Sequence, residues 1–394
     1  MAKSLYIAGI EARSGKSVIS LGMMEILSRR IRNVGYFRPV IPSNRLPDNN
    51  IQLIRTRYNT ELAHEEMYGI TNDAAQKMST LGQSAPLLNT ILLKYKALES
   101  KCKFILCEGT DFTGVSSAFE FDFNADVANN LGSPVLVLVN GRGRSPAAIG
   151  EVVTVARESF EGKGCTILAT IVNRVDPDMC PKVESLFKKE MSQTSPVWVL
   201  PEEPVLRKPT IDDIVQALGA RILHAQADDM TREVSGFKVA AMHLPHFLER
   251  IEEGDLIITP GDRSDMILGS LTATLSGTYP SLAGLLLTGG LKPDPQIMHL
   301  LDGFKKQLSL PVICSGKDTY TTAMEAGRVR SSLSAGNHRK IAVALGLFEA
   351  HIDLAVLADR INVVRSRRVT PLMFEYELIE RARADRRHIV LPEG

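Results

Sequence analysis

The sequence predicts an α/β protein in which a doubly wound, mostly parallel sheet is followed by a smaller α/β unit. Short apolar runs of the kind buried in parallel strands alternate with stretches whose apolar residues recur at helical spacing. This alternation stops at a segment with four prolines, residues 196–209, and resumes beyond it in shorter elements. The 394 residues are also enough for two domains, each with a core of its own.

The first predicted strand ends in a loop that is typical of phosphate binding. An apolar run ends at Gly9, five residues follow, and Gly15-Lys16-Ser17 then begins a helical pattern. Such a loop directs backbone N–H groups into one hollow, where the helix N-terminus adds partial positive charge. We expect Lys16 to reach the terminal phosphates of a nucleotide and the Ser17 hydroxyl to bind Mg²⁺. The spacing departs by one residue from the strict G-x-x-x-x-G-K-[ST] motif, and a glycine turn with a solvated lysine is the alternative.

Further strands and helices alternate up to the proline-bearing segment. After a helix, the apolar patterns predict strands over residues 35–40, 104–107, 135–139 and 165–172, with helical stretches at 72–99 and 145–159. The carboxyl ends of parallel strands meet at one edge of a sheet, where doubly wound proteins bind their ligands. Gly9, Glu108, Asn140 and Asn173 all fall at those ends.

Two of these strand-end residues have candidate roles. Glu108 faces the predicted phosphate loop and is able to hold Mg²⁺ directly or through water, although a surface glutamate at a strand end is an equal alternative. The side-chain amide of Asn173 is able to read a purine edge, since it donates and accepts at once. An asparagine satisfied within a turn is the alternative for that position.

The second unit has two strand-end loops of its own. Asp262-Arg263 and Thr288-Gly289-Gly290 each follow directly on a short predicted strand. They offer a carboxylate, a guanidinium and open backbone N–H groups, a set that is able to hold an anion. A structural ion pair beside a tight turn explains the same residues.

Composition excludes several classes of partner and site. With 46 basic and 45 acidic residues, no overall charge favours nucleic acid or an anionic membrane. The five cysteines include no C-x-x-C pair, which argues against disulfides and zinc and fits a reducing cytoplasm. The eight histidines show no zinc-binding H-E-x-x-H pattern. The longest apolar region, residues 341–358, contains ionisable side chains and predicts a packed helix rather than a membrane span.

Three motifs of the first unit resemble a known group of proteins. Residues 9–17, 37–40 and 107–109 are similar to motifs of the dethiobiotin synthetase and cobyrinic acid synthase group, and the resemblance covers residues 1–207. It implies a P-loop domain that binds Mg²⁺ with ATP or another nucleotide. Ala12-Arg13 replaces a Thr-Glu pair of the dethiobiotin synthetases and Arg38 replaces a lysine. These differences argue against the carboxylate-activating chemistry of that enzyme.

The second unit and the last residues resemble two further domains. The motifs at 262–263 and 288–290 are similar to those of the DRTGG domain. Residues 375–394 resemble the lead-in and first strand of a phosphate acetyltransferase catalytic domain, and this order of domains is that of long-form phosphate acetyltransferases. The resemblance implies a P-loop domain over 1–208, a DRTGG domain with C-terminal helices over 209–358, a linker helix over 359–385 and the first strand of a truncated transferase domain over 386–394.

The same resemblance implies a function. The chain would be a sensory region that binds a nucleotide or related metabolite and regulates its own C-terminal transferase domain, with no acetyltransferase residues of its own. It also implies a homo-oligomer in the cytoplasm, without nucleic-acid or membrane partners. A stand-alone ATP-dependent enzyme of the dethiobiotin or cobyrinate type is the alternative, because Lys16 and Ser17 are intact.

Overall fold

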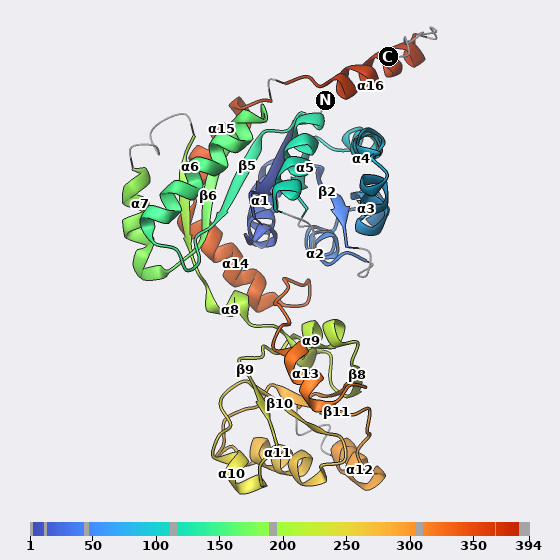
Figure 1. Ribbon diagram of the computed structural model, residues 1–394, viewed down its shortest axis with the longest axis vertical. Coiled ribbons are helices and arrows are strands. Elements are labelled where there is room, and N and C mark those ends of the chain that lie inside the picture. The colour runs from blue at the N-terminus through green and yellow to red at the C-terminus, as the bar shows by residue number, and fades with distance from the viewer. Residues whose placement is uncertain are drawn as a thin grey trace. The chain divides into compact units, whose positions relative to one another are not determined.

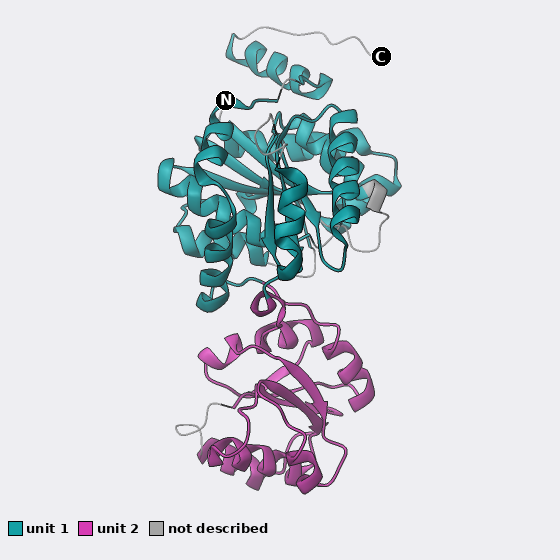
Figure 2. Cartoon of the chain, turned by 90° about the vertical axis from the view of Figure 1, so that its left-hand side faces the viewer, with its two compact units in different colours: residues 1–203, 333–394 teal, residues 204–332 magenta. Residues whose placement is uncertain are grey.

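The chain forms two compact α/β units. A computed structural model describes residues 3–11, 14–42, 47–110, 117–188, 195–303, 310–366 and 368–385. Unit 1 comprises Met1–Glu203 and Leu333–Gly394, and unit 2 comprises Pro204–Ser332 (Figure 2). Unit 2 is therefore inserted between two segments of unit 1.

Unit 1 contains a seven-stranded sheet whose pairings are all parallel (Figure 1). Its order is β3-β2-β4-β1-β5-β6-β7, so the first strand lies in the middle and the order reverses there. This arrangement confirms the doubly wound, mostly parallel sheet. The strands are β1 (Lys3–Gly9), β2 (Val34–Ile41), β3 (Tyr68–Thr71), β4 (Phe104–Glu108), β5 (Val135–Asn140), β6 (Ile167–Val175) and β7 (Val197–Pro201).

Helices flank this sheet and enclose its buried strands. In β5, for example, the side chains of Val135 to Val139 are all 0% exposed. The helices before the second unit are α1 (Lys16–Arg30), α2 (Asn49–Tyr58), α3 (Asn72–Thr80), α4 (Ser84–Glu99), α5 (Ser117–Asn130), α6 (Pro146–Gly162) and α7 (Cys180–Phe187). Ser145 caps α6, because its side chain accepts a hydrogen bond from the Ala148 N–H. The structure adds β3, α2 and β7 to the expected elements, and β7 lies within the proline-bearing segment.

The chain returns to unit 1 after the second unit. It forms α14 (His338–His351), α15 (Leu354–Val363) and α16 (Pro371–Ala384) there. Helix α14 packs on α1 and β7, and a Cβ added to Gly22 of α1 would lie 2.3 Å from the Phe348 ring. The sequence expectation grouped residues up to 358 with the second unit and made 359–385 a linker. The difference arises because the apolar face of α14 is buried within unit 1.

The apolar region around α14 has a packing explanation. Ile341, Ala344 and Phe348 recur at helical spacing and are all buried. Among the described residues, no single helix is long and apolar enough to cross a membrane, and α14 and α15 pass that test only as a pair bent by 81°. The strand expected at residues 386–394 lies outside the described residues.

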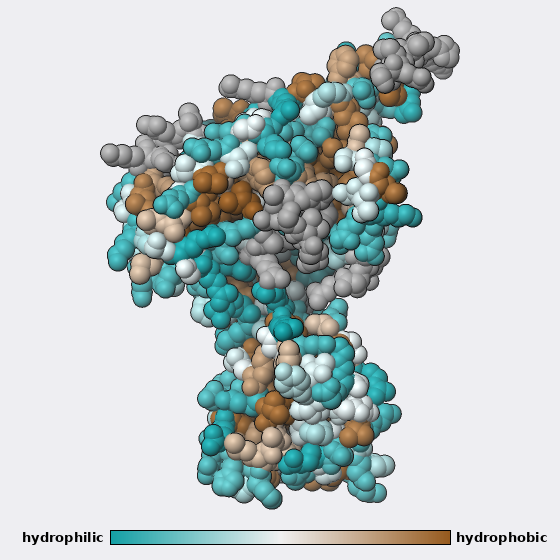
Figure 3. All heavy atoms as spheres, in the orientation of Figure 1, coloured by the Kyte–Doolittle hydropathy of each residue, from teal (hydrophilic) through white to brown (hydrophobic). Residues whose placement is uncertain are grey.

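Exposed apolar side chains also occur. Tyr320, Val363 and Phe374 are exposed, and on the face that Figure 3 shows, apolar side chains lie between hydrophilic ones. Isolated exposed apolar residues are normal on soluble proteins. They give no argument for self-assembly of this chain.

Unit 2 contains a five-stranded sheet of order β8-β12-β11-β10-β9, in which only the β8–β12 pairing is antiparallel. Its strands are β8 (Arg221–His224), β9 (Gly236–Val239), β10 (Asp255–Pro260), β11 (Gly284–Thr288) and β12 (Val312–Cys314). Its helices are α8 (Pro204–Arg207), α9 (Ile211–Leu218), α10 (Leu244–Leu248), α11 (Ser264–Ser276), α12 (Pro295–Gly303) and α13 (Thr319–Ala326). Thr210 and Asp213 form the capping box of α9.

Candidate functional site

The phosphate loop connects β1 to α1 at the strand where the sheet order reverses. Gly15 stands at the start of α1 with φ +90°, and a Cβ there would lie 2.2 Å from Nδ2 of Asn173. A Cβ on Gly9 would lie 2.8 Å from the Leu138 carbonyl oxygen. At both predicted glycines, a larger residue would collide with neighbouring atoms of the protein. Gly15 also has a left-handed backbone conformation that favours glycine.

Asn173 on β6 holds this loop. Its buried side-chain amide donates to the Ser14 carbonyl oxygen over 2.8 Å. One of its two N–H groups is thus used within the protein, and the reading of a purine edge stays a prediction. Ser14 itself is 0% exposed, and its Oγ has no hydrogen-bond partner among the described residues. A buried hydroxyl of this kind in the loop has hydrogen-bonding capacity for a ligand.

Ser17 and Glu108, the two predicted metal ligands, are brought together by a third residue. The Asn50 side-chain nitrogen donates to Ser17 Oγ over 2.8 Å and to Glu108 Oε1 over 2.7 Å. Both oxygen atoms therefore converge on the same nitrogen. Lys16 begins α1 beside them and is 5% exposed.

The Glu108 carboxylate is 1% exposed and surrounded by donors. The Tyr36 hydroxyl donates to Oε2 over 2.8 Å, and Arg38 Nε lies 3.5 Å from Oε1. Burial, followed by the negative charge of Glu108, raises the pKa of Tyr36 well above its ordinary value, so this hydroxyl stays a donor. Arg38 also pairs with Asp48, whose side chain caps α2 by accepting from the Ile51 N–H.

These residues fit a magnesium ion carried by a nucleotide. Among the described residues, no three His, Cys, Asp or Glu side chains are grouped to hold a metal. Magnesium does not need such a group, because it is commonly held by one or two protein oxygens together with phosphates and water. Ser17 Oγ and Glu108 Oε1 supply two oxygens, provided that the Asn50 amide releases them.

The structure adds residues that the sequence did not single out for this site. Asn50 and Asp48 belong to the start of α2, a helix without a clear apolar signal in the sequence. Arg144, in the loop after β5, forms an ion pair with Glu11 at 2.7 and 3.1 Å. In the sequence, a run of glycines and arginines at 141–144 directly after a predicted strand marks this neighbour of the phosphate loop.

The two DRTGG motif segments of unit 2 lie next to each other. Thr288 pairs with Pro260 in adjacent parallel strands, and the Gly261 N–H donates to the Thr288 carbonyl over 3.3 Å. Thr288 Oγ1 lies 2.7 Å from Thr319 Oγ1. Adjacency of the two segments therefore follows from strand pairing.

The backbone N–H groups expected to be open in these segments are occupied. The Gly289 N–H donates to the Lys317 carbonyl over 2.7 Å, and the Gly290 N–H donates to the Ser315 carbonyl over 2.9 Å. Arg263 pairs with Asp265 through two contacts of 2.9 Å. The structure thus shows the alternative of an ion pair beside a tight turn, in which the two glycines adopt φ +78° and +65°. The Gly289 and Gly290 N–H groups are therefore not open, and anion binding by the two segments stays a prediction.

Two sequence families match the chain. The family described as "AAA domain" matches residues 3–223, and the family described as "DRTGG domain" matches residues 213–329. Together they cover residues 3–329, which leaves the returning segment of unit 1, Leu333–Gly394, outside both matches. The first match extends over more than half of the chain.

Curated relatives match the chain over its whole length. A phosphate acetyltransferase of Nitratidesulfovibrio vulgaris is 40% identical, with 100% of this chain and 56% of that protein covered. A phosphate acetyltransferase of Synechocystis sp. is 35% identical, with 100% and 57% covered. One of Escherichia coli is 25% identical, with 96% and 56% covered. The chain therefore spans about half the length of the curated relatives it matches.

Solved structures also align with parts of the chain. The CBS and DRTGG domains of the regulatory region of Clostridium perfringens pyrophosphatase, complexed with diadenosine tetraphosphate, are 26% identical over 32% of this chain and 48% of that one, with a TM-score of 0.25. MinD of Pyrococcus horikoshii, complexed with Mg-ADP, is 16% identical over 52% of this chain and 84% of the MinD chain, with a TM-score of 0.32.

Proposed function

Since this chain belongs to the AAA-domain family and carries a DRTGG domain, we propose that it is the regulatory, ligand-sensing N-terminal region of a phosphate acetyltransferase. The supporting findings are the two domains in series and the matches, over 100% of this chain, to about half of two phosphate acetyltransferases at 40% and 35% identity. The whole protein would interconvert acetyl-CoA and phosphate with acetyl phosphate and CoA. The chain's own share would be binding of an effector rather than acetyl transfer.

The proposed effector is a nucleotide with Mg²⁺, either ATP or another, or a related phosphate-bearing metabolite. One observation carries this choice: Ser17 Oγ and Glu108 Oε1 converge at the end of a phosphate loop. Lys16 would reach the phosphates, Ser17 and Glu108 would hold the ion, and the Ser14 hydroxyl would donate to the ligand. The bound ion would supply positive charge between the phosphates and these two oxygens.

Regulation requires an effector that binds two states of the protein with different affinity. Helix α2 would be an element that differs between such states, because Asn50 in its first turn holds both of the oxygens proposed to bind the metal. An ion between Ser17 and Glu108 would take the place of this amide. The contacts at the N-terminal end of α2 would therefore change when Mg²⁺ and nucleotide bind.

Calorimetric titration of the chain with ATP, GTP and their diphosphates, with and without Mg²⁺, tests the binding. Lys16→Ala should abolish binding of at least one of these ligands without lowering the melting temperature markedly. Lys94→Ala, at an exposed position on α4, is the matched control and should bind as the parent does. Unchanged affinity in Lys16→Ala would overturn the proposed role of the loop.

A stand-alone ATP-dependent enzyme of the dethiobiotin or cobyrinate type is the second candidate. The convergence of Ser17 and Glu108 at the loop is the observation that favours it. This candidate predicts steady ATP turnover by the chain when a small carboxylic acid is present. Binding without turnover would favour the regulatory function instead.

Two further parts of the proposal concern assembly and compartment. A homo-oligomer is proposed from the family resemblance alone, and light scattering at micromolar concentration tests it. For the cytoplasm, the supporting observation is that all five cysteines are free thiols, four of them buried. Nucleic acid and membranes are not among the proposed partners, because positive and negative charges are balanced.

A further inference from the structure

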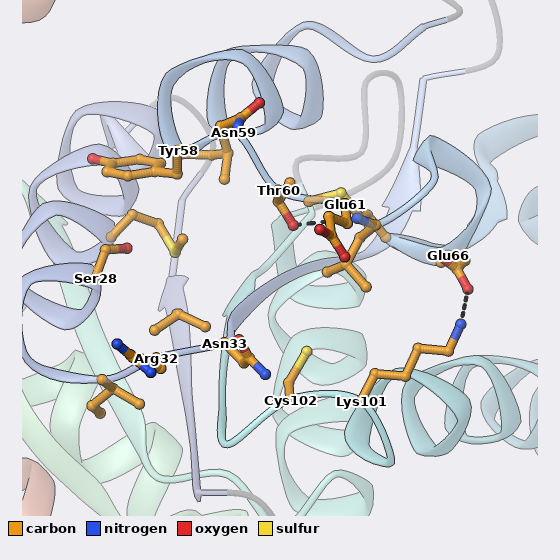
Figure 4. Close-up of a pocket in the computed structure, with 16 residues that line it drawn as sticks. Ser28, Arg32, Asn33, Tyr58, Asn59, Thr60, Glu61, Glu66, Lys101 and Cys102 are labelled. Atoms are coloured by element: carbon orange, nitrogen blue, oxygen red, sulfur yellow. Dashed lines mark hydrogen bonds and ion pairs between the residues drawn. The ribbon is translucent and has the colours of Figure 1, made fainter.

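Unit 1 contains a cavity that the phosphate loop does not line. It has a volume of about 590 Å³ and is formed by the second half of α1, the C-terminal end of α2 with its following loop, and the chain before β2 and β4 (Figure 4). The residues before β2 and β4 lie at the amino ends of parallel strands, whereas the phosphate loop lies at a carboxyl end. The cavity therefore opens at the opposite edge of the sheet. Its volume is within the range of small-molecule sites.

The floor of the cavity is apolar and rich in sulfur. Met24, Ile54 and Met67 line it and are all buried, and the half-buried Cys102 adds a thiol. Thioethers are polarisable and make favourable contacts with aromatic rings. This floor suits an apolar, and especially an aromatic, group.

The rim carries one cation and one anion that are available to a ligand. Lys101 pairs with Glu66, so these two charges compensate each other. Within the ranges that the structure describes, neither the Arg32 guanidinium nor the Glu61 carboxylate has a hydrogen bond or an ion pair, and both residues are exposed. Arg32 follows α1 and Glu61 follows α2, so the two charges come from different sides of the cavity.

The C-terminal end of α2, which precedes Glu61, adds to the negative side. The last turns of α1 and α2 both contribute lining residues, among them Ser28 and Tyr58. The last carbonyl groups of a helix have no intrahelical donors, and each C-terminus carries about half a negative charge. A positively charged ammonium group is stabilised beside such a helix end. A negatively charged group is stabilised only near Arg32.

We propose that this cavity binds a zwitterionic amino acid with an apolar side chain. The carboxylate pairs with Arg32, the ammonium group is held by Glu61 and the C-terminus of α2 that precedes it, and the side chain packs on the apolar floor. This site shares no residue with the proposed nucleotide site. Loss of amino-acid binding would therefore leave the proposed nucleotide binding unaffected.

The test uses phenylalanine and two analogues that each lack one charge. Phenylpropionate has no ammonium group, and phenethylamine has no carboxylate. Cys102 is the readout, because the other four cysteines are buried. Alkylation of the native chain with N-ethylmaleimide at mildly alkaline pH, followed by mass spectrometry, measures how far each compound protects this thiol. Calorimetric titration with phenylalanine gives a second measurement that does not depend on the thiol.

Phenylalanine should protect Cys102 saturably, and each analogue should bind about tenfold more weakly or worse. Arg32→Ala and Glu61→Gln should each weaken phenylalanine about tenfold, whereas Arg30→Ala, at an exposed position outside the cavity lining, should leave its affinity unchanged. Equal protection by phenylpropionate would show an anion site and overturn the zwitterion. Absence of binding in both measurements, or an equal loss in Arg30→Ala, would overturn the site.

Discussion

The side-chain amide of Asn50 donates to the Glu108 carboxylate over 2.7 Å. The same nitrogen reaches Ser17 Oγ over 2.8 Å, so one amide joins the starts of α1 and α2 to the end of β4. The two oxygens that fit Mg²⁺ are therefore hydrogen-bonded before any ion arrives. In the proposed site, Mg²⁺ would have to replace this amide.

Replacing this amide by a carboxylate should make the protein depend on Mg²⁺ for stability. Asn50→Asp removes both hydrogen bonds and places a negative charge beside Glu108, so without Mg²⁺ we expect a loss of about 2 kcal/mol, or roughly 5 °C in melting temperature. Millimolar Mg²⁺ should restore it, because the ion compensates both carboxylates. Asn50→Ala is the control: it frees the same two oxygens without adding a carboxylate, so Mg²⁺ should stabilise it clearly less than Asn50→Asp. Equal responses of the two variants to Mg²⁺ in a thermal denaturation series would contradict this view of the site.

The phosphate loop should not tolerate a side chain at Gly15. Gly15→Ala requires a left-handed conformation and places Cβ 2.2 Å from Asn173 Nδ2, which displaces the bond to Ser14. Gly143→Ala is a matched control, because its φ is +70° and no atom lies within 4 Å of its Cβ. We expect the control to cost about 1 kcal/mol and Gly15→Ala at least about 2 kcal/mol. Urea denaturation of the two variants measures this difference in stability. Equal losses in the two variants would argue against the hydrogen bond between the Asn173 amide and the Ser14 carbonyl.

Cys102 should react slowly with alkylating reagents at neutral pH. Burial, and then the nearby Glu66 carboxylate, raise the pKa of Cys102 from 9.0 to about 11. Because only the thiolate reacts, the rate should be about 100-fold lower at pH 7 than for a thiol of ordinary pKa, and should rise about tenfold per pH unit up to pH 10. Glu66→Gln removes the negative charge that raises the pKa and should accelerate alkylation. A rate that reaches a plateau below pH 9 would argue against this environment.

In unit 2, the glycine that matters most for stability should be Gly261 rather than the two glycines of the second motif segment. A Cβ on Gly261 would lie 2.0 Å from the Leu291 carbonyl oxygen, whereas the nearest atom to a Cβ on Gly290 is 3.6 Å away. Gly290→Ala should cost about 1 kcal/mol for its left-handed backbone, and Gly261→Ala clearly more. Hydrogen exchange of peptides from residues 204–332, followed by mass spectrometry, separates the effect on unit 2 from that on unit 1. Similar protection in the two variants would show that the Leu291 segment moves aside at little cost.

The sequence was sufficient for the fold class and for the position of the phosphate loop. Gly9, Gly15 and Ser17 lie where the strand, loop and helix pattern predicted them, because this pattern depends on local sequence. The predicted neighbour Glu108 also reaches the loop, since the carboxyl ends of parallel strands meet at one edge. These contacts follow from periodicity and from the rules of parallel sheets.

Other features depend on contacts between distant residues. Asn50 lies in a polar stretch whose helix has only three buried residues, so no periodic signal marks it. The hydrogen bonds that occupy the N–H groups of Gly289 and Gly290 come from carbonyls of residues 315 and 317. The attachment of α14 to unit 1 rests on the fit of Phe348 against Gly22. None of these pairs is adjacent in sequence, and each needs the tertiary structure to bring its members together.

The fit of Phe348 against Gly22 has a consequence for synthesis of the chain. The 325 residues between them include the whole of unit 2, and both α1 and β7 are made before α14 leaves the ribosome. During translation, the surface of α1 that α14 covers therefore stays exposed until unit 2 has been synthesised. Folding of the inserted unit shortens the distance over which the returning segment must search, since a compact domain replaces a long flexible loop. Synthesis of unit 1 thus begins before that of unit 2, but unit 2 is the first of the two whose chain is complete.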